Sequence, residues 1–341
     1  MTKIPVQRDS AKYAIVVPVY NIAPYLSECL NSILAQTYTN FTVFAVDDGS
    51  TDESGEILDR YSKSDQRILV LHTANQGVSA ARNVALEHIE ASGIFDYIAF
   101  VDSDDTISRS MLKSLVSEAQ TRNADLVTGA FSSFDSNGKT YVKGALFPSH
   151  RLTKENYLSL IFSCGPYKNL CGRGGMVWKC LYKAQTIQGL RFEENRGTCE
   201  DEVYSTRVAL QAKAIYYIPE ILYFYRWRTG SLANNKQFDL QLLDGRHKAF
   251  VLARELSEEA ALISSSSYMK AILSSAKKQG SLKGIRVDLS QFWLKKTLAS
   301  GLVDKKRVFQ WYLLTNHPSV FSCYCTLRRV LRPNKQDPKK Y

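Results

Sequence analysis

The sequence predicts an α/β fold in which helices flank a mostly parallel, Rossmann-like sheet, followed by a mainly helical C-terminal region. Short apolar runs cover residues 13–19, 41–46, 68–71 and 97–101, and a segment with helical periodicity follows each of them. The runs are apolar almost throughout, as expected of parallel strands covered by helices on both faces. Polar residues follow each run, which predicts a binding site along one edge of the sheet.

The first two predicted strands lead into helices with clear start signals. Residues 13–19 form the first strand, and Pro24 suits the first turn of the helix that follows. Residues 41–46 form the second strand, and residues 50–52 offer caps for the next helix. The apolar positions expected to face the sheet from these helices are Leu26, Leu30, Ile33, Leu34, Ile57, Leu58 and Tyr61.

The alternation of strand and helix continues through about residue 130. Residues 68–71 form a third strand, and a helix begins near Ser79 after a short loop. Residues 97–101 form a fourth strand, residues 111–120 a further helix, and residues 125–128 open a fifth strand. The repetition of this unit predicts a doubly covered sheet with right-handed crossovers.

Polar side chains cluster at the predicted carboxyl ends of the strands, where ligands bind in such sheets. The segment Asp102-Ser103-Asp104-Asp105 places three carboxylates within four residues, and they repel one another unless a cation compensates. Mg²⁺ and Mn²⁺ prefer such oxygen ligands. A capping turn is the alternative reading of this segment taken by itself. The groups expected at the same edge are Tyr20-Asn21, Asp47-Asp48, Asn75 with Gly77, and Asp102 with Asp104.

The motifs at this edge disfavour two common nucleotide sites and favour a third kind. No GxGxxG follows the first strand, and no GxxxxGK[ST] occurs, so neither a classical dinucleotide site nor a P-loop is expected. The Tyr20 ring can instead stack on a base, and the Asp48 carboxylate can accept hydrogen bonds from a base or ribose. Base recognition beside a metal suggests a nucleoside diphosphate whose phosphates share the cation.

Four segments in register with their strands resemble family 2 inverting glycosyltransferases of the GT-A fold. They read VVPVYN at 16–21, VDDGSTD at 46–52, NQGVSAARN at 75–83 and FVDSDD at 100–105. The resemblance continues through residues 176–183, Arg191-Phe192, residues 199–202, 223–228 and 230–231, and covers roughly the first 230 residues. It implies the GT-A fold and the transfer of a sugar from a nucleotide sugar.

The resemblance also implies roles for individual residues. Asp104 would be the principal ligand of a divalent metal, Mn²⁺ or Mg²⁺, with Asp102 as a second ligand nearer the ribose. Tyr20 would stack on the base and Asp48 would bond its edge. Arg82 would lie near Asp102 or near the sugar and phosphates, or form an ion pair that balances the acids. The remaining residues implied at the nucleotide-sugar site are Pro18, Asn21, Asn75, Gly77 and Ser103.

The Glu200-Asp201 pair is the predicted catalytic element. Inversion by direct displacement needs a base that removes the proton of the acceptor hydroxyl, and a placed carboxylate can do so. The resemblance favours Asp201 over Glu200 for this role. The structural alternative is an acidic helix N-terminus before residues 203–210, which the helix dipole favours, and both roles are compatible.

The charge distribution predicts a domain boundary near residue 235. The net charge is +11, but residues 1–235 hold 24 Lys and Arg against 25 Asp and Glu, a balance of −1. Residues 236–341 hold 20 Lys and Arg against 8 Asp and Glu, a balance of +12. We therefore expect a GT-A domain over 1–235, with a nucleotide-sugar half to about 130 and an acceptor half to 235, and a basic, mainly helical region over 236–341.

The basic region of residues 236–341 predicts contact with an anionic membrane surface. The competing interpretation is an ordinary helical bundle whose basic face is solvated. Helical periodicity covers residues 241–256, 268–278, 291–302 and 307–314, with lysines, arginines and aromatic residues interleaved. A lipid-linked saccharide acceptor would explain docking of this kind. Nucleic acid is the less favoured partner of such a surface.

The remaining features suggest a cytoplasmic protein, peripheral to the inner face of the plasma membrane if the basic region docks there. Residues 1–12 lack the apolar stretch of a signal peptide, and no apolar run reaches about 18 residues. The seven cysteines form no CxxC pair, so we expect neither a zinc site nor a disulfide framework. The histidines show no metal spacing, and residues 171–175 are interpreted as a loop over the acceptor site.

We conclude from the sequence that a metal-dependent inverting glycosyltransferase is the favoured function. The donor would be a nucleotide-diphosphate sugar, with a UDP-sugar suggested by the resemblance. The acceptor would be a saccharide or lipid-linked saccharide hydroxyl, in the synthesis of cell-surface polysaccharide. The alternatives are a sugar nucleotidyltransferase, which would want a Gly-rich basic loop after the first strand, and a silent protein that binds saccharide or nucleotide. Retention of Asp102, Asp104, Glu200 and Asp201 argues against the silent protein.

Overall fold

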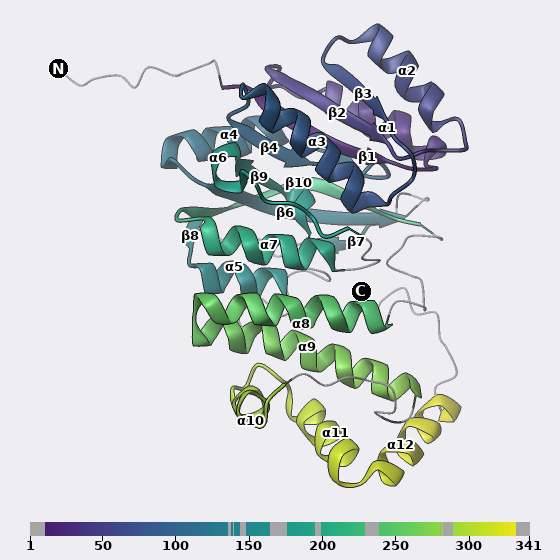
Figure 1. Cartoon of the computed structure of the whole chain (residues 1–341), viewed down its shortest axis with the longest axis vertical. Coiled ribbons are helices and arrows are strands. Elements are labelled where there is room, and N and C mark those ends of the chain that lie inside the picture. The colour runs from purple at the N-terminus through teal and green to yellow at the C-terminus, as the bar shows by residue number, and fades with distance from the viewer. Residues whose placement is uncertain are drawn as a thin grey trace, which may run out of the picture.

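The computed structural model contains one mixed sheet covered by helices, with further helices stacked at one end of the molecule (Figure 1). It describes residues 11–135, 138, 140–143, 148–163, 176–194, 199–228, 239–279, 281 and 289–331 of the 341-residue chain. The predicted fold class, an α/β sheet flanked by helices with a helical C-terminal region, is confirmed.

The parallel half of the sheet has the order β3-β2-β1-β4. The strands are β1 (Tyr13–Val19), β2 (Phe41–Asp47), β3 (Ile68–His72) and β4 (Tyr97–Phe100). Val19 lies beside Asp47, and Asp47 beside His72, so the carboxyl ends of β1, β2 and β3 are level. The residues that follow these strands therefore share one edge, as the sequence predicts.

Alternate residues of β1 enter two separate cores, one on each face of the sheet. Tyr13, Ile15 and Val17 pack against one group of helices, and Ala14 and Val16 face the other side. Helices α1 (Ala23–Leu34), α2 (Ser54–Ser64) and α4 (Met111–Arg122) cover the first face, whereas α3 (Val78–Ser92) covers the second. Burial on both faces explains why the strands are continuous apolar runs.

Beyond β4 the sheet departs from the simple alternation. Strand β9 (Cys180–Lys183) lies antiparallel between β4 and β6 (Leu126–Asp135), so the predicted fifth strand is not the neighbour of the fourth. Strand β10 (Ile215–Trp227) runs parallel to β6. The short strands β5 (Thr106–Ile107), β7 (Thr140–Lys143) and β8 (His150–Leu152) pair antiparallel with their neighbours. The four residues of β9 carry no directional signal in the sequence.

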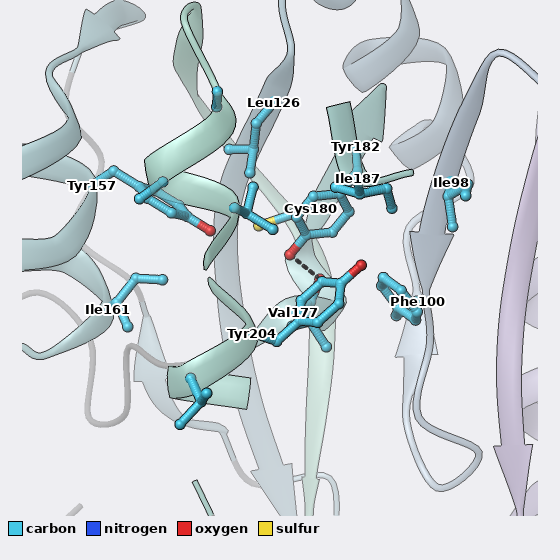
Figure 2. Close-up of a cluster of buried hydrophobic side chains, with 14 of the residues drawn as sticks. Ile98, Phe100, Leu126, Tyr157, Ile161, Val177, Cys180, Tyr182, Ile187 and Tyr204 are labelled. Atoms are coloured by element: carbon cyan, nitrogen blue, oxygen red, sulfur yellow. Dashed lines mark hydrogen bonds between the residues drawn. The ribbon is translucent and has the colours of Figure 1, made fainter. Parts of the chain in front are cut away.

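The second core continues from the sheet into four further helices. Helices α5 (Lys154–Ile161) and α7 (Glu200–Gln211) contribute residues such as Tyr157 and Tyr204. The Tyr204 ring lies 6.0 Å from the Phe100 ring and 6.4 Å from the Tyr182 ring, between centroids (Figure 2). The Tyr204 ring stacks on Phe192 at 4.0 Å between centroids. Helices α8 (Asp239–Leu256) and α9 (Glu258–Gln279) pack against α7 and α5 and add alanines to the same core.

The C-terminal helices form a third core, which includes Phe250, Tyr268, Trp311 and Phe321. They are α10 (Gln291–Ala299), α11 (Lys305–Asn316) and α12 (Pro318–Leu331), and the last of these extends the helical region beyond the periodic segments seen in the sequence. The short α6 (Ala184–Ile187) lies earlier, after β9. None of the helices in the described ranges is both long and apolar enough to cross a membrane.

Candidate active site

The turn after β1 carries the two residues predicted to meet a base. Pro18 is buried within β1, and the Tyr20 ring that follows it is 47% exposed at the edge of the sheet. Asn21 adopts φ 46°, a left-handed conformation that asparagine tolerates well. Its side-chain oxygen accepts hydrogen bonds from the amides of Thr51 at 2.8 Å and Asp52 at 3.3 Å. Asn21 thus fixes the turn after β2 and leaves the neighbouring Tyr20 ring open to a ligand.

Asp48 holds the loop that precedes α3. Its two carboxylate oxygens accept from the amides of Gln76 at 2.9 Å and Gly77 at 2.7 Å. Gly77 has φ +94°, and Asn75 beside it is exposed. Gly49 has φ +71°, and a Cβ there would lie 2.8 Å from the Asn75 nitrogen. The close approach of the two loops therefore depends on glycine and on the Asp48 carboxylate.

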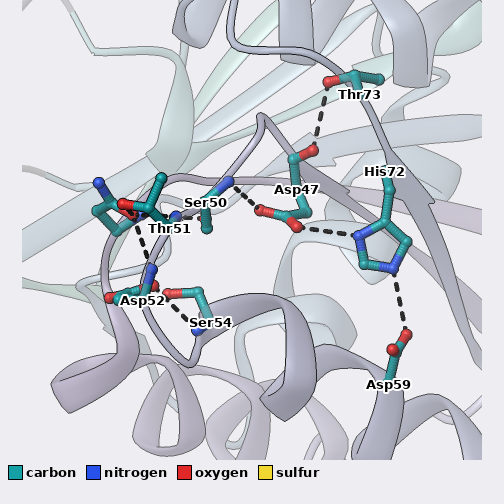
Figure 3. A network of polar contacts seen from close by, with 9 residues as sticks. Asp47, Ser50, Thr51, Asp52, Ser54, Asp59, His72 and Thr73 are labelled. Atoms are coloured by element: carbon teal, nitrogen blue, oxygen red, sulfur yellow. Dashed lines mark hydrogen bonds and ion pairs between the residues drawn. The ribbon is translucent and has the colours of Figure 1, made fainter.

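A second polar network supports the same edge from the side of β3 (Figure 3). Asp47 accepts from the Ser50 amide at 3.0 Å and contacts His72 Nδ1 at 2.9 Å. His72 Nε2 lies 3.2 Å from Asp59 on α2. The Asp47 hydrogen bond is the main cause of the raised pKa of His72. The sequence indicates a surface or packing role for the histidines, and the pairing of β2 with β3 is what places His72 opposite Asp47.

The central feature of the site is a buried guanidinium between two groups of acids. Arg82 Nη2 lies 2.9 Å from Asp102 Oδ1, while Nη1 lies 2.8 Å from Asp201 Oδ1 and 3.3 Å from Glu200 Oε1. The Arg82 side chain is 3% exposed, and its Cζ lies 5.0 Å from the Phe192 ring centroid. Arg82 therefore joins the acidic turn after β4 to the first turn of α7.

Burial shapes the charge state of these groups. It raises the pKa of Asp201 well above the usual range, and the charge of Arg82 counteracts part of that rise. Burial also raises the pKa of Asp102, again against the influence of Arg82. For Arg82 itself burial lowers the pKa, but the three carboxylates outweigh this effect and raise it. The guanidinium is a countercharge that favours the ionised form of these partly buried acids.

The other acids of the turn after β4 are tied to the end of β10. Asp104 Oδ2 lies 2.7 Å from Arg228 Nε. Asp105 is fully buried, and its carboxylate accepts from the Tyr223 hydroxyl at 2.8 Å and the Arg226 amide at 2.7 Å. The same hydroxyl accepts from the Asp102 amide at 3.0 Å, and Ser103 is buried between these acids. Asp105 is thus a structural acid that fixes the turn.

The chemistry of this turn fits a divalent cation. Asp102 and Asp104 each have one carboxylate oxygen in an arginine pair, and their side chains are 26% and 19% exposed. The other oxygen of each is a hard donor of the kind that Mg²⁺ and Mn²⁺ select. No group of three or more His, Cys, Asp or Glu side chains among the described residues forms a complete cage. A cation at this turn would therefore need oxygens from a ligand such as a diphosphate.

Two supporting residues escaped the sequence analysis. The Asn83 side chain accepts from the Phe192 amide at 2.8 Å and donates to the Phe192 carbonyl at 2.9 Å, which fixes the ring beneath Arg82. Trp178 stacks on Tyr223 at 4.0 Å between centroids and supports the hydroxyl that binds the turn after β4. Both lie inside segments that the resemblance covers, but their partners are more than 40 residues away in the chain. The predicted loop at 171–175 and residues 230–231 lie outside the described residues.

Comparison with known proteins gives a consistent result. Residues 14–173 match the model described as glycosyl transferase family 2. Among curated proteins, the chain is 36% identical over 231 residues to glycosyltransferase GlyG of Streptococcus pneumoniae, covering 67% of this chain and 74% of that protein. It is 35% identical over 229 residues to glycosyltransferase GlyA of the same species, covering 65% of this chain but only 31% of that longer protein.

A solved structure shares the fold over nearly the whole chain. It is residues 1–349 of TarS from S. aureus in complex with UDP-GlcNAc, with a TM-score of 0.66 and 20% sequence identity. The match covers 94% of this chain and 92% of the other, so the likeness includes the C-terminal helices.

Proposed function

The chain belongs to glycosyltransferase family 2, and we propose that it transfers a sugar from a nucleotide-diphosphate sugar to a saccharide hydroxyl, with inversion and with a divalent metal. The observation that carries the proposal is the position of Arg82. One guanidinium contacts Asp102, from the donor-binding motif, and Asp201, from the proposed catalytic pair. Residues 99 positions apart in the sequence thereby lie around a single group, as a reaction between donor and acceptor requires.

The nucleotide part of the donor would lie over the edge formed by β1 and β2. The exposed Tyr20 ring can stack on a base, and Asp48 orders the loop of Gln76 and Gly77 beside it. A UDP-sugar is the favoured donor, because the TarS structure of the same fold contains UDP-GlcNAc. Pro18, Asn21, Asn75 and Ser103 complete the proposed donor site.

Asp201 is the proposed base. The acceptor oxygen attacks the anomeric carbon, its proton passes to the Asp201 carboxylate, and the bond from that carbon to the diphosphate oxygen breaks. The pair of electrons from that bond leaves with the nucleoside diphosphate. Asp201 Oδ1 bonds Arg82 at 2.8 Å, which fixes the carboxylate, and the charge of Arg82 counteracts part of the rise in its pKa that burial causes. Its raised pKa also makes it a stronger base than an exposed carboxylate.

Asp104 and Asp102 would hold Mn²⁺ or Mg²⁺ through their unpaired oxygens, and the diphosphate would supply further ligands. The cation would neutralise the charge of the departing diphosphate. Arg228 already contacts Asp104, and Arg226 bonds the Asp104 carbonyl at 2.8 Å, so the end of β10 brings positive charge to the same place.

The first test compares Asp201→Asn with Glu200→Gln. Asn keeps the shape of the side chain but cannot accept the proton, so we expect transfer to fall roughly 10²–10⁴-fold while UDP affinity, measured by calorimetry, changes little. Glu200→Gln removes the negative charge at the longer contact with Arg82, 3.3 Å, and should retain most of the activity. Full transfer by Asp201→Asn would overturn the assignment of the base.

The second test addresses donor and metal. We expect hydrolysis or transfer with UDP-sugars in the presence of Mn²⁺, its loss when the metal is chelated, and weaker activity with GDP- and dTDP-sugars. Asp104→Asn should weaken Mn²⁺ binding measured directly. Formation of a nucleotide sugar from a sugar phosphate would instead indicate a nucleotidyltransferase, and binding without turnover would indicate a silent protein.

The proposed acceptor is a saccharide or lipid-linked saccharide used in cell-surface polysaccharide synthesis. The proposed location is the cytoplasm, with peripheral contact to the inner face of the membrane through residues 236–341. The boundary that the charge balance predicts at residue 235 can be tested by the melting of truncated chains.

A further inference from the structure

The outer face of α11 is unusual for a helix on the surface of a folded protein. Its inner face packs Trp311 and Leu314 into the third core against α9. The opposite face carries Phe309, 58% exposed, and Tyr312, 52% exposed, which follow one another at helical spacing. A helix on a protein surface normally presents polar residues to the solvent. Two large aromatic rings on the solvent-facing side of α11 therefore indicate a contact surface for another molecule or assembly.

The neighbouring helices extend this apolar character. Phe292 on α10 is 57% exposed and Val320 on α12 is 53% exposed. These two, with the two aromatic residues of α11, make up half of the eight exposed large hydrophobic side chains found among the described residues. Helix α11 contacts α12, and α10 to α12 all rest on α9, so the four belong to consecutive helices at one end of the molecule (Figure 1).

The segment that carries these apolar groups is strongly basic. Residues 289–331 contain seven Lys and Arg and one acid, Asp304, which is paired with Arg307. Lys295, Lys305 and Lys306 are exposed and make no ion pair with another described residue. Lys305 and Lys306 begin α11, within one turn of Phe309.

We propose that the surface of Phe292, Phe309, Tyr312 and Val320, with Lys305 and Lys306, docks on an anionic lipid bilayer. Aromatic rings favour the interfacial zone of a bilayer, and lysines reach anionic headgroups with their flexible stems. We favour lipid over duplex nucleic acid, because an aliphatic side chain such as Val320 can enter the apolar zone of a bilayer but gains nothing against a phosphate backbone. The surface is separate from Arg82 and its acids, so docking does not depend on the proposed transfer activity.

The test is co-sedimentation of the full chain with vesicles. We expect binding to phosphatidylcholine vesicles that contain about 30% phosphatidylglycerol, weak binding to pure phosphatidylcholine, and a steep loss with added salt. Phe309→Ser with Tyr312→Ser should reduce the partition coefficient by about tenfold or more. Lys305→Gln with Lys306→Gln should reduce it by about fivefold for each lysine.

Controls separate docking from folding and from other partners. Ile94→Ser removes an equally exposed side chain, at 53%, from the connection between α3 and β4, and should leave vesicle binding unchanged. Circular dichroism would establish that each variant is folded, and hydrolysis of the donor sugar should be the same in all of them. Equal binding by the Phe309/Tyr312 variant and the wild-type chain would overturn the proposal. So would a stable dimer in light scattering that the same two substitutions abolish, since a second copy would then cover the surface.

Discussion

At the scale of single residues, the site depends on how the charge of Arg82 is shared. Three carboxylates lie within 3.3 Å of a guanidinium that is almost entirely buried. Isolated carboxylates at this depth would take up protons. Arg82 is the common partner of Asp102, on the donor side of the proposed site, and of Asp201, on the acceptor side. A substitution of Arg82 should therefore change the ionisation of both carboxylates.

We therefore expect Arg82→Met to impair catalysis more than Arg82→Lys. Methionine keeps much of the volume but removes the charge, so the pKa of Asp201 should rise further. The acid limb of the pH–rate profile should move to higher pH, with transfer at pH 7 reduced by roughly 10²-fold or more. Arg82→Lys keeps a positive charge, concentrated on one ammonium group. It should therefore reverse part of the shift in the pH–rate profile.

The measurement is transfer rate against pH for both variants, together with UDP affinity. A pH profile that stays in place in Arg82→Met would show that Arg82 does not control the ionisation of Asp201.

The sequence could predict Arg82, Asp102 and Asp201 as site residues, because each stands in a recognisable motif. It could not predict that Arg82 and Asp201 touch, since 119 positions separate them and only the placement of α7 against α3 brings them together.

At the scale of elements, the parallel half of the sheet was predictable because local signals agreed with the fold. Runs such as 13–19 and 41–46 are apolar on both faces, and the helices after them begin near Pro24 and residues 50–54. The antiparallel insertion of β9 was not predictable, since its four residues offer neither length nor periodicity. Pairing of this kind is decided by long-range packing, here by Tyr182 in the core beside Phe100.

The network that links β2, β3 and α2 gives a prediction about stability and pH. His72 has a raised pKa because it bonds Asp47 and, on its other side, Asp59. The protonated ring therefore stabilises the folded state fully below the pKa of an unfolded histidine, about 6.5, and this contribution is lost as the pH rises through the higher folded value. His72→Gln should cost on the order of 0.5 kcal/mol near pH 5.5, a small value because the ring is half exposed.

Urea unfolding of wild type and His72→Gln at pH 5.5 and pH 9 measures this difference. We expect it to shrink at the higher pH. His88→Gln is the matched control, because His88 lies on α3 and contacts the Val84 carbonyl at 2.8 Å instead of a carboxylate. A His72 difference that is equal at the two pH values would mean that the ring acts through packing and not through its charge.

At the scale of the whole molecule, the charge boundary near residue 235 does not coincide with a boundary of the core. Ala249 and Ala253 of α8, with Ala260 and Ile263 of α9, belong to the same buried cluster as residues of α5, α7 and the sheet. Arg246 on α8 also pairs with Glu202 on α7 at 3.2 Å. Composition reports which surfaces are charged, whereas the core depends on which helix faces are apolar, and the two need not change at the same residue.

This arrangement predicts that a fragment of residues 1–235 is much less stable than the full chain. Removal of α8 and α9 would expose the outer faces of α5 and α7, and α7 carries Glu200 and Asp201. We expect the melting temperature to fall by on the order of 10 °C and the transition to broaden. A fragment of residues 1–281 keeps α8 and α9 and should lose much less, although it lacks α10 to α12. Calorimetry of the full chain and the two fragments measures these melting temperatures. If residues 1–235 melt at the temperature of the full chain, that region is an independent domain. The shared core would then contribute little to its stability.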